Sequence, residues 1–431
     1  MSDDQFDAIV VGAGCAGAVA AYRLASAGRS VLVVERGNYA GAKNMTGGRI
    51  YTHALARVFP DFEGSAPLQR RITHEKISMA APDALFTMDF TADELRESGK
   101  DSYAVLRGPF DQWLAERAEE AGADFIYGIA VEDLIVRDGR VCGVVAGGDE
   151  VEARITVLAD GANSLLAQKA GLADDVPLPC QMAVGAKETI ALPPSVIEDR
   201  FLCAPGEGAA WMFAGDCTKG RVGGGFLYTN DDSISLGLVA TLSDLAAGDV
   251  PIYQMLEDFK QRADIAPLVK GGELVEYSGH LVPEGGLAMV PRLYGDGVLV
   301  CGDAAMLCMN LGYSVRGMDF AVSSGDLAAD AVMRALEADD VSAEQLAAYE
   351  QLLDGCYVLQ DLKRFRRFPR YMEETTRIFN EYPAMARDIM LNLFKVDGHP
   401  QARIKDKLLG PLKRVGLWRV AQDGRKGMKA L

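Results

Sequence analysis

The sequence predicts an α/β fold with a Rossmann-like dinucleotide-binding domain, an inserted antiparallel β-sheet domain and a C-terminal helical region. Three observations predict it. A β-rich run, a glycine-spaced turn, an apolar helix and a second strand follow one another in residues 6–36. Short alternating strands and glycine-rich turns fill residues 176–280. A strand, a sharp turn and a long helix typical of the first domain return at 297–335.

The chain of 431 residues exceeds the usual size of a single hydrophobic core, so more than one domain is expected. The dinucleotide-binding domain is predicted to be discontinuous and to comprise residues 1–75, 101–175 and 281–335. The inserted sheet is assigned residues 76–100 and 176–280, and the helical, basic region is assigned residues 336–431.

The turn after the first strand carries the spacing G-x-G-x-x-G at Gly12, Gly14 and Gly17. The first glycine allows a tight turn, the second lets the backbone approach a pyrophosphate, and the third lets helix and strand pack closely. Cys15 and Ala16 begin the helix, whose free N–H groups and positive end point at the phosphates. We therefore predict that this unit binds a dinucleotide.

Glu35 ends the second strand, eighteen residues after Gly17. A carboxylate at this spacing accepts hydrogen bonds from an adenosine ribose and repels a 2′-phosphate, so FAD or NAD is favoured over NADP. Arg36 follows it directly and is included in the predicted site.

Two later segments point to the same crevice. Residues 102–121 predict a short strand that ends at Arg107, followed by an amphipathic helix. An apolar strand at 155–158 leads into the sharp turn Asp160-Gly161. The alternatives are a surface cation at Arg107 and an ordinary turn at Asp160-Gly161.

The returning strand at 297–301 ends in Gly302-Asp303, and a long helix begins at about Gly317. A carboxylate at the end of a strand suits a polyhydroxyl chain, and a helix N-terminus suits a ring that gains negative charge on reduction. A flavin has both requirements. The alternative for Asp303 is a simple turn cap.

The net charge of −17 is unevenly distributed. Residues 363–431 contain 17 Lys and Arg against 7 Asp and Glu, a balance of +10 that leaves −27 for the rest. The acidic body disfavours nucleic-acid binding. The basic tail, with interleaved Leu and Trp residues, is predicted to meet an acidic protein or anionic lipid, or else to fold back on the acidic body.

The eight cysteines form no C-x-x-C pair, and the four histidines are scattered, so no metal site is predicted. The sequence contains no run of about 18 uncharged apolar residues. The first predicted strand starts close to Met1, so no signal peptide is expected. A cytoplasmic location with reduced thiols is expected, with the alternative of peripheral contact with the inner face of the cell membrane.

Together these motifs resemble the flavoprotein superfamily of p-hydroxybenzoate hydroxylase, geranylgeranyl reductases and electron-transfer-flavoprotein quinone oxidoreductases. Within it the chain is similar to the FixC family over essentially its whole length. The segments that carry this resemblance are ERGNYAGAKNMTGGRIY at 35–51, ITHEKI at 72–77, VLRGPFDQWLAERAEEAGA at 105–123, VIEDRF at 196–201, GGGFLYTNDDSISLGLV at 223–239, QMLEDFK at 254–260, GDAAMLCMNLGYSVRGMD at 302–319 and the basic end.

The resemblance implies a p-hydroxybenzoate hydroxylase-like fold with FAD as the cofactor. It implies that the glycine turn and Glu35 hold the ADP half, that Arg107 lies over the pyrophosphate, and that Asp303 binds the ribityl chain. The residues 312–318 would flank the flavin ring. The predicted cofactor site comprises Gly12, Gly14, Cys15, Ala16, Gly17, Glu35, Arg36, Lys43, Thr46, Gly47, Gly48, Arg107, Asp160, Gly161, Gly302, Asp303, Gly312, Gly317 and Met318.

Several assignments keep an alternative. A polar loop after the second strand is predicted to touch the flavin, and the alternative is an ordinary surface loop; its residues are Lys43, Asn44, Thr46, Gly47, Gly48 and Arg49. Arg316 either stabilises an anionic reduced flavin or forms a structural ion pair. Cys301, Cys308, Trp211 and Phe213 are interpreted as packing residues.

The resemblance implies an FAD-dependent oxidoreductase that passes electrons from an electron-transfer flavoprotein toward quinone, as the FixC-like subunit of a FixABCX-type complex. No catalytic acid, base or nucleophile is required, because the flavin carries the chemistry. Only Cys356 follows Cys308, so a four-cysteine cluster cannot form there, and a separate small ferredoxin-like subunit is the expected partner. The alternatives are a geranylgeranyl-reductase-like isoprenoid reductase and a non-catalytic, FAD-bearing scaffold.

Overall fold

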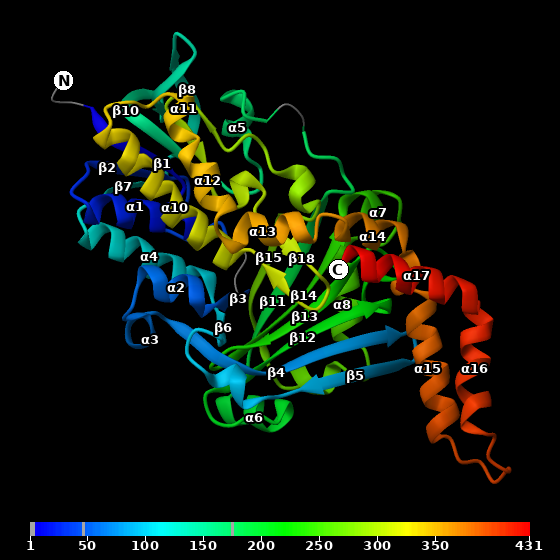
Figure 1. Ribbon diagram of the computed structural model, residues 1–431. Helices are drawn as coiled ribbons and strands as arrows, with labels where there is room; N and C mark the ends of the chain where they lie inside the picture. The colour runs from blue at the N-terminus through cyan, green and yellow to red at the C-terminus, as the bar shows by residue number, and fades with distance from the viewer. Residues whose placement is uncertain (1–4, 45–47, 174–175) are drawn as a thin grey trace.

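Two large sheets lie side by side in the computed structural model, which describes residues 5–44, 48–173 and 176–431 (Figure 1). One sheet carries the dinucleotide-binding motif and lies at the N-terminal end of the molecule. The other is larger, and the C-terminal helices extend beyond it.

The first sheet is built around β1, the strand that precedes the glycine turn. Its neighbours pair with β1 in parallel on both sides, and the antiparallel pairs are β16–β17 at the edge and the β8–β9 hairpin with its contact to β10. The strands β1, β2 and β17 are almost entirely apolar because they are buried on both faces. In spatial order they are β16 Tyr294–Gly295, β17 Val298–Val300, β10 Asp149–Leu158, β1 Phe6–Val11, β2 Val31–Glu35 and β7 Asp124–Tyr127, with the hairpin β8 Val131–Arg137 and β9 Arg140–Ala146 attached to β10.

The second sheet contains the inserted segment and also the strands β3, β4 and β6 from the first part of the chain. Its pairs are antiparallel except β4–β12, which is parallel because the two strands come from separate segments with no hairpin between them. In spatial order the strands are β15 Glu273–Pro283, β11 Met182–Ala191, β14 Ser233–Thr241, β13 Gly223–Thr229, β12 Glu207–Gly215, β4 Leu68–Ala81, β6 Ser102–Val105 and β3 Gly48–Tyr51, with β5 Ala84–Phe90 beside β4.

The domain boundaries stay a prediction. The continuous strand β4 runs across the boundary expected between residues 75 and 76. Strand β17 returns to the first sheet beside β10 after the inserted segment, as expected for a discontinuous domain.

The helices of the first 340 residues pack on both sheets and connect their strands. They are α1 Cys15–Ser26, α2 Thr52–Val58, α3 Phe62–Ser65, α4 Arg107–Glu120, α5 Leu165–Lys169, α6 Pro194–Phe201, α7 Leu242–Ala246, α8 Ile252–Lys260, α9 Ala266–Val269 and α10 Met318–Glu337. Short 3-10 turns lie at η1 Asp93–Arg96, η2 Asp216–Thr218, η3 Gly286–Met289 and η4 Gly302–Ala305, and a two-stranded ribbon is formed by β18 Met309–Asn310 and β19 Val315–Arg316.

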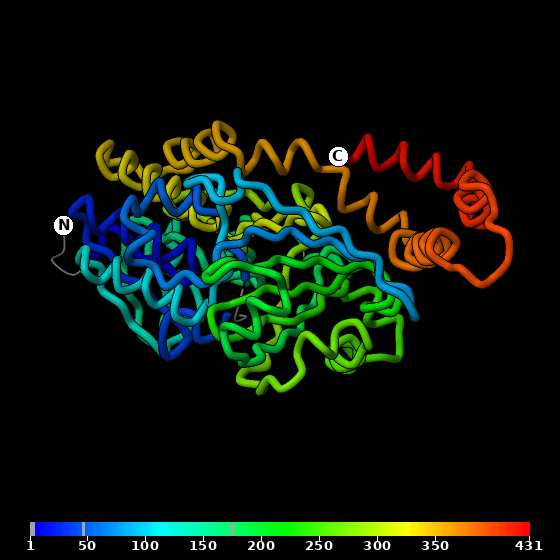
Figure 2. The backbone as a smooth tube through the Cα atoms, turned by 90° about the horizontal axis from the view of Figure 1, so that it is seen from below, coloured from blue at the N-terminus to red at the C-terminus, as the bar shows by residue number. Residues whose placement is uncertain are grey.

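The C-terminal region is helical, as predicted. It begins beside the first sheet, projects past the second sheet as the antiparallel pair α15 and α16, and returns with α17 to α14 (Figures 1 and 2). Its elements are α11 Ala343–Leu346, α12 Ala348–Asp354, α13 Tyr357–Arg364, α14 Phe368–Glu374, η5 Thr376–Ile378, α15 Glu381–Phe394, α16 Ile404–Val415 and α17 Leu417–Ala430. None of the helices in the described ranges combines the length and the apolar character needed to cross a bilayer.

Helix α1 lies in close contact with α10. A Cβ atom added at Gly325 of α10 would lie 2.2 Å from the backbone oxygen of Ala16, so only glycine fits this crossing. Gly325 therefore sets how closely the first helix of the motif can approach the last helix of the same domain.

We expect Gly325→Ala to lower the free energy of unfolding by about 1 to 3 kcal/mol, because overpacking forces backbone shifts. The matched control is Gly424→Ala in α17, where an added Cβ meets no atom within 4 Å. There alanine is expected to stabilise the helix by up to about 1 kcal/mol. Urea titration of both variants measures the difference, and equal stabilities would show that the α1–α10 contact is not tight.

Candidate functional site

A cavity of about 1450 Å³ opens where the parallel strands end. Its wall includes the last residues of two strands, Val11 of β1 and Glu35 of β2, and the residues that directly follow two others, Ala159 after β10 and Cys301 after β17. The carboxyl ends of parallel strands are where open α/β sheets bind their ligands. From there the cavity continues along the second sheet and reaches α14.

The three motif glycines do different things. A Cβ at Gly12 would lie 2.4 Å from the Ala159 oxygen, and a Cβ at Gly17 would lie 1.9 Å from the Gly12 oxygen. These two glycines serve close packing, and Gly17 is not part of the cavity wall. Gly14 does line the cavity, and an added Cβ there would meet only side chains 3.8 Å away.

Glu35 is buried at the cavity wall and held by backbone groups. The N–H of Ala13 donates to Oε2 at 2.8 Å, and the N–H of Gly37 donates to Oε1 at 2.6 Å. These two bonds fix the carboxylate where the predicted ribose contact requires it, and each oxygen keeps a lone pair for a ligand hydroxyl.

Arg107 begins helix α4 and does not end a strand, so this part of the prediction was wrong: β6 ends at Val105. The helix begins at Arg107 because its guanidinium pairs with Asp111, four residues later in the same helix. Arg107 Nε and Nη2 donate to the two Asp111 carboxylate oxygens at 2.9 and 2.8 Å. Asn44 also donates to Asp111. The guanidinium therefore lies beside Gly14, where an added Cβ would be 3.8 Å from Nη2.

A cation and a helix N-terminus converge at this point. The first N–H groups of α1 and the Arg107 guanidinium both favour an anion, which is the arrangement a pyrophosphate requires. Cys15 also lines this part of the wall, but burial raises the pKa of its thiol, so it stays protonated.

Two half-buried carboxyl groups face the cavity farther along. Burial raises the pKa of Asp160 to about 6, and its Oδ1 has no hydrogen-bond partner in the described part of the chain. Burial also raises the pKa of Asp303, opposed by Arg107 and His280. Ligand hydroxyl groups would satisfy both carboxyl groups, so they fit the sugar and ribityl parts of FAD.

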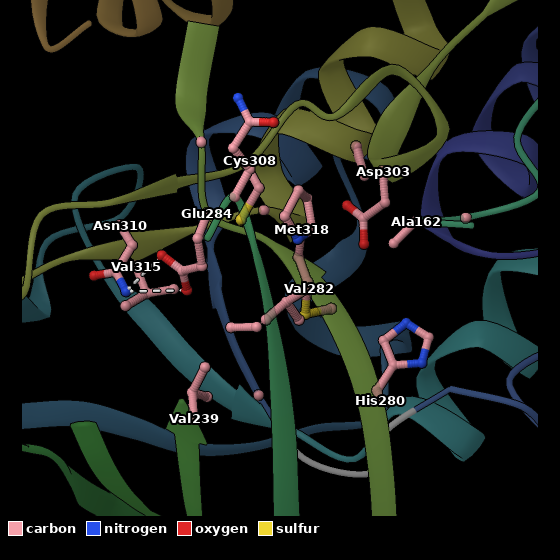
Figure 3. A pocket seen from close by; sticks show the side chains of 18 of the residues that line it. Ala162, Val239, His280, Val282, Glu284, Asp303, Cys308, Asn310, Val315 and Met318 are labelled. Atoms are coloured by element: carbon pink, nitrogen blue, oxygen red, sulfur yellow. Dashed lines mark hydrogen bonds between the residues drawn. The ribbon is translucent and has the colours of Figure 1, made fainter. Parts of the chain in front are cut away.

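The far part of the predicted site is less polar. Met318, Val282 and Val239 surround it, and Figure 3 shows them between Asp303 on one side and Glu284 on the other. Arg36, Lys43, Gly48, Gly312 and Gly317 also line the cavity. Thr46 and Gly47 lie outside the described residues.

Two further predicted residues lie behind the wall. The N–H of Gly302 donates to Ser324 Oγ at 2.9 Å, and an added Cβ would lie 2.8 Å from that of Ala16, so Gly302 serves packing. Arg316 is not in the wall. Its guanidinium binds Asp319 and Asp361, each at 2.8 Å, which is the ion-pair alternative named for it.

The structure also places two residues of the predicted flavin-side loop, Gly48 and Arg49, and the two aromatic residues interpreted as packing, Trp211 and Phe213. Gly48 and Arg49 begin strand β3 and are not part of a loop, because Arg49 is anchored by Glu75 at 2.9 Å. Trp211 is buried in the second core, where it donates to Ser78 Oγ at 2.7 Å. Phe213 belongs to the same core but also reaches the cavity wall.

Sequence reasoning missed several wall residues. His280, Glu284 and Asn310 line the cavity, as do Phe368 and Met372 of α14. Asn310 lies within the quoted segment 302–319 but was not assigned to the site, and the other four belong to no quoted motif, so only the fold brings these residues together. Asp111 was also missed, although its spacing from Arg107 is that of a helical ion pair.

Comparisons with known proteins find two family models and full-length relatives that match this chain. The model "ETF-QO/FixC family C-terminal domain" matches residues 368–431, and "FAD dependent oxidoreductase" matches residues 7–97. Protein FixC of Escherichia coli K12 is 50% identical over 431 residues, with 100% of both chains covered. The chain belongs to the ETF-QO/FixC family. It is an FAD-dependent oxidoreductase, as predicted.

A second relative of this ETF-QO/FixC chain is the probable electron transfer flavoprotein-quinone oxidoreductase YdiS of E. coli K12, 50% identical over 433 residues with full coverage of both chains. Among solved structures, a geranylgeranyl bacteriochlorophyll reductase-like protein of Thermoplasma acidophilum has a TM-score of 0.71 at 18% identity, covering 97% of this chain and 99% of that one. A probable FAD-dependent monooxygenase of Pseudomonas aeruginosa, PqsL, has a TM-score of 0.60 at 17% identity, covering 88% and 98%. These confirm the predicted fold class.

Bound FAD supplies the electron-accepting and electron-donating chemistry of this family. The protein's own residues would bind and orient it: the α1 N-terminus and Arg107 would hold the phosphates, and Glu35 would accept the ribose hydroxyls. Val239 and Val282 give the far part of the cavity an apolar wall. Within residues 5–44, 48–173 and 176–431, no cluster of three His, Cys, Asp or Glu side chains is placed to hold a metal ion.

We expect Gly14→Val to fold normally but to lose most of its FAD. The protein itself leaves room for the new side chain, so the loss would come from blocking the pyrophosphate. Flavin absorbance per chain measures occupancy, and circular dichroism measures folding. Gly64→Val is the control, because its Cβ meets nothing within 4 Å and Gly64 lies outside the cavity. Full occupancy in Gly14→Val would remove the pyrophosphate assignment.

Proposed function

We propose that this protein passes electrons from an electron-transfer flavoprotein, through its FAD, to a quinone. In this proposal it acts as the FixC-like subunit of a FixABCX-type complex, and a separate small ferredoxin-like subunit carries the iron–sulfur cluster. The observation that carries the proposal is the cavity, which continues from the dinucleotide motif along the second sheet to α14.

The continuous cavity supports the proposal because a quinone needs access to the flavin from another direction than the ADP half. The wall near α14 includes Phe213, Phe368 and Met372, which suit an apolar, planar ring. α14 begins the segment matched by the ETF-QO/FixC C-terminal model. The curated relative YdiS is described as a probable quinone oxidoreductase that uses an electron transfer flavoprotein.

The tip of the α15–α16 pair supports peripheral contact with a membrane. Phe394, Val396 and Ile404 are 79%, 83% and 68% exposed there, and Lys395 and Arg403 lie among them. Apolar side chains beside cations suit the interface of an anionic bilayer.

The second candidate is an isoprenoid reductase of the geranylgeranyl-reductase kind. The cavity favours it, since its volume of about 1450 Å³ is large and apolar residues such as Ile77, Met212 and Val239 line it. It predicts a lipid product with reduced double bonds. The two functions are distinguished by assaying quinol and saturated isoprenoid from the same reduced protein.

We expect an electron-transfer flavoprotein to reduce the flavin quickly, and NADH or NADPH to reduce it slowly. The sequence has no second G-x-G-x-x-G unit for a nicotinamide dinucleotide. Stopped-flow absorbance of the flavin compares the two donors. Fast reduction by NADPH, with turnover of an aromatic substrate, would instead indicate a monooxygenase.

We expect the double variant Phe394→Asp, Val396→Asp to lose binding to vesicles of phosphatidylglycerol and phosphatidylcholine while it keeps full FAD content. The reason is the loss of buried apolar area at the bilayer surface. Cosedimentation measures the binding. Leu202→Asp is the control, because Leu202 is 76% exposed at the end of α6, away from the tip. Unchanged cosedimentation of the double variant would exclude the tip as the membrane contact.

A further inference from the structure

Glu284 is a carboxyl group in the cavity wall, outside the predicted cofactor residues. It directly follows β15, and its backbone N–H donates to the Gln181 oxygen at 2.7 Å. The side chain points to Asn310 of the ribbon strand β18, with Cys308 above it in Figure 3. The backbone hydrogen bond to Gln181 therefore fixes the main chain of Glu284, and the Asn310 amide fixes its carboxyl group.

Asn310 has a defined orientation. Its Oδ1 accepts the N–H of Gly312 at 2.8 Å, so its Nδ2 must turn toward Glu284. Nδ2 donates to the two carboxyl oxygens of Glu284 at 3.3 and 3.2 Å, as the dashed lines in Figure 3 show. Since Gly312 belongs to the predicted flavin-side loop, these bonds tie Glu284 to that loop.

The surroundings of Glu284 are mostly apolar. α13, α14 and the turn between them present Leu362, Phe368 and Phe365 to a small hollow beside it. Burial raises the pKa of Glu284 to about 7, and the hydrogen bond from Asn310 opposes that rise. The titratable and charged groups that line the same part of the cavity are Cys308, whose pKa burial also raises, His280 of β15, Cys180, and Arg366, Arg370, Glu373 and Glu374 at the α14 side.

We propose that Glu284, oriented by Asn310, is the proton donor to the quinone that is reduced in this cavity. The inference rests on the proposed function. Its geometric basis is position: Glu284 lies between the predicted flavin-side residue Gly312 and the α14 end of the cavity.

A quinone needs two electrons and two protons to become a quinol. Both electrons and one proton come from the anionic reduced flavin, and the Glu284 O–H bond breaks to supply the second proton to the other quinone oxygen. The products are oxidised flavin, quinol and the Glu284 carboxylate, which Asn310 stabilises until solvent returns the proton through the cavity.

The test compares wild type and Glu284→Gln after chemical reduction of the FAD-loaded protein. Reoxidation by a short-chain quinone should fall about 100-fold or more in the variant, the size typical of a lost general acid. Reoxidation by ferricenium, which takes up no proton, should be unchanged. The wild-type rate with quinone should also fall as the pH rises through about 7, and the variant should lose this dependence.

Glu284→Asp should restore part of the quinone rate because it keeps an acid. Glu273→Gln is the matched control, since Glu273 is an exposed carboxylate of the same strand β15 and lies outside the cavity. Equal quinone rates in wild type and Glu284→Gln would overturn the role of Glu284 alone. A wild-type protein that ferricenium reoxidises but quinone does not would overturn the proposed function as well.

A second readout needs no turnover. The pKa of Glu284 in the folded protein lies above its ordinary value of 4.5, so wild type loses stability as the pH rises from about 4.5 through 7. Glu284→Gln carries no charge and should therefore unfold at a higher temperature than wild type at pH 8, but not at pH 4.5. A difference independent of pH would show that Glu284 does not hold its proton in the folded protein.

Discussion

The close contact around the N-terminus of α1 is the constraint on which the rest of the structure depends. Gly12 and Gly17 bring the helix against the turn after β10, and Gly325 brings α10 against the opposite side of the same helix. No side chain fits at these three points. The ribbon β18–β19 directly precedes α10, so the packing of α10 on α1 also fixes the position of this ribbon. The geometry of the whole cavity is thus set by backbone contacts near one helix end.

The cationic, carboxyl and apolar parts of the cavity wall follow one another in the same order as the phosphates, the hydroxyl groups and the ring of FAD. Near Gly14, the positive end of α1 and the Arg107 guanidinium create a place for phosphates. Farther along, burial raises the pKa values of Asp160 and Asp303, which makes each carboxyl group depend on hydrogen bonds from a ligand. Beyond them the wall becomes apolar. A ligand with phosphates at one end, hydroxyl groups in the middle and a planar ring at the other end satisfies all three parts at once.

The sequence could predict those parts of the site whose residues are close together in the chain. Gly12, Gly14 and Glu35 belong to one βαβ unit, so spacing alone identified them. The start of α4 was misplaced because the short strand β6 and the helix are joined by a single residue, Leu106, and only the Arg107–Asp111 pair marks the boundary. Glu284 could not be found, since it lies in no quoted motif and the second sheet, the ribbon and α14 meet there from distant segments, and nothing in the sequence pairs it with Asn310.

The C-terminal segment has two parts with different physical roles. Asp423 of α17 is buried and accepts bonds from Arg377 at 2.7 and 2.8 Å and from Tyr382 at 2.6 Å, so α17 is locked onto the chain that follows α14. α14 itself forms cavity wall. Deleting everything beyond residue 402 would therefore remove α16 and α17, and with them both the support for α14 and part of the exposed tip, so a loss of FAD and a loss of docking would have the same origin. Substitutions confined to the tip avoid this problem, because Phe394 is exposed there and has no packing role. Only they distinguish a loss of surface docking from a loss of the cavity's structure.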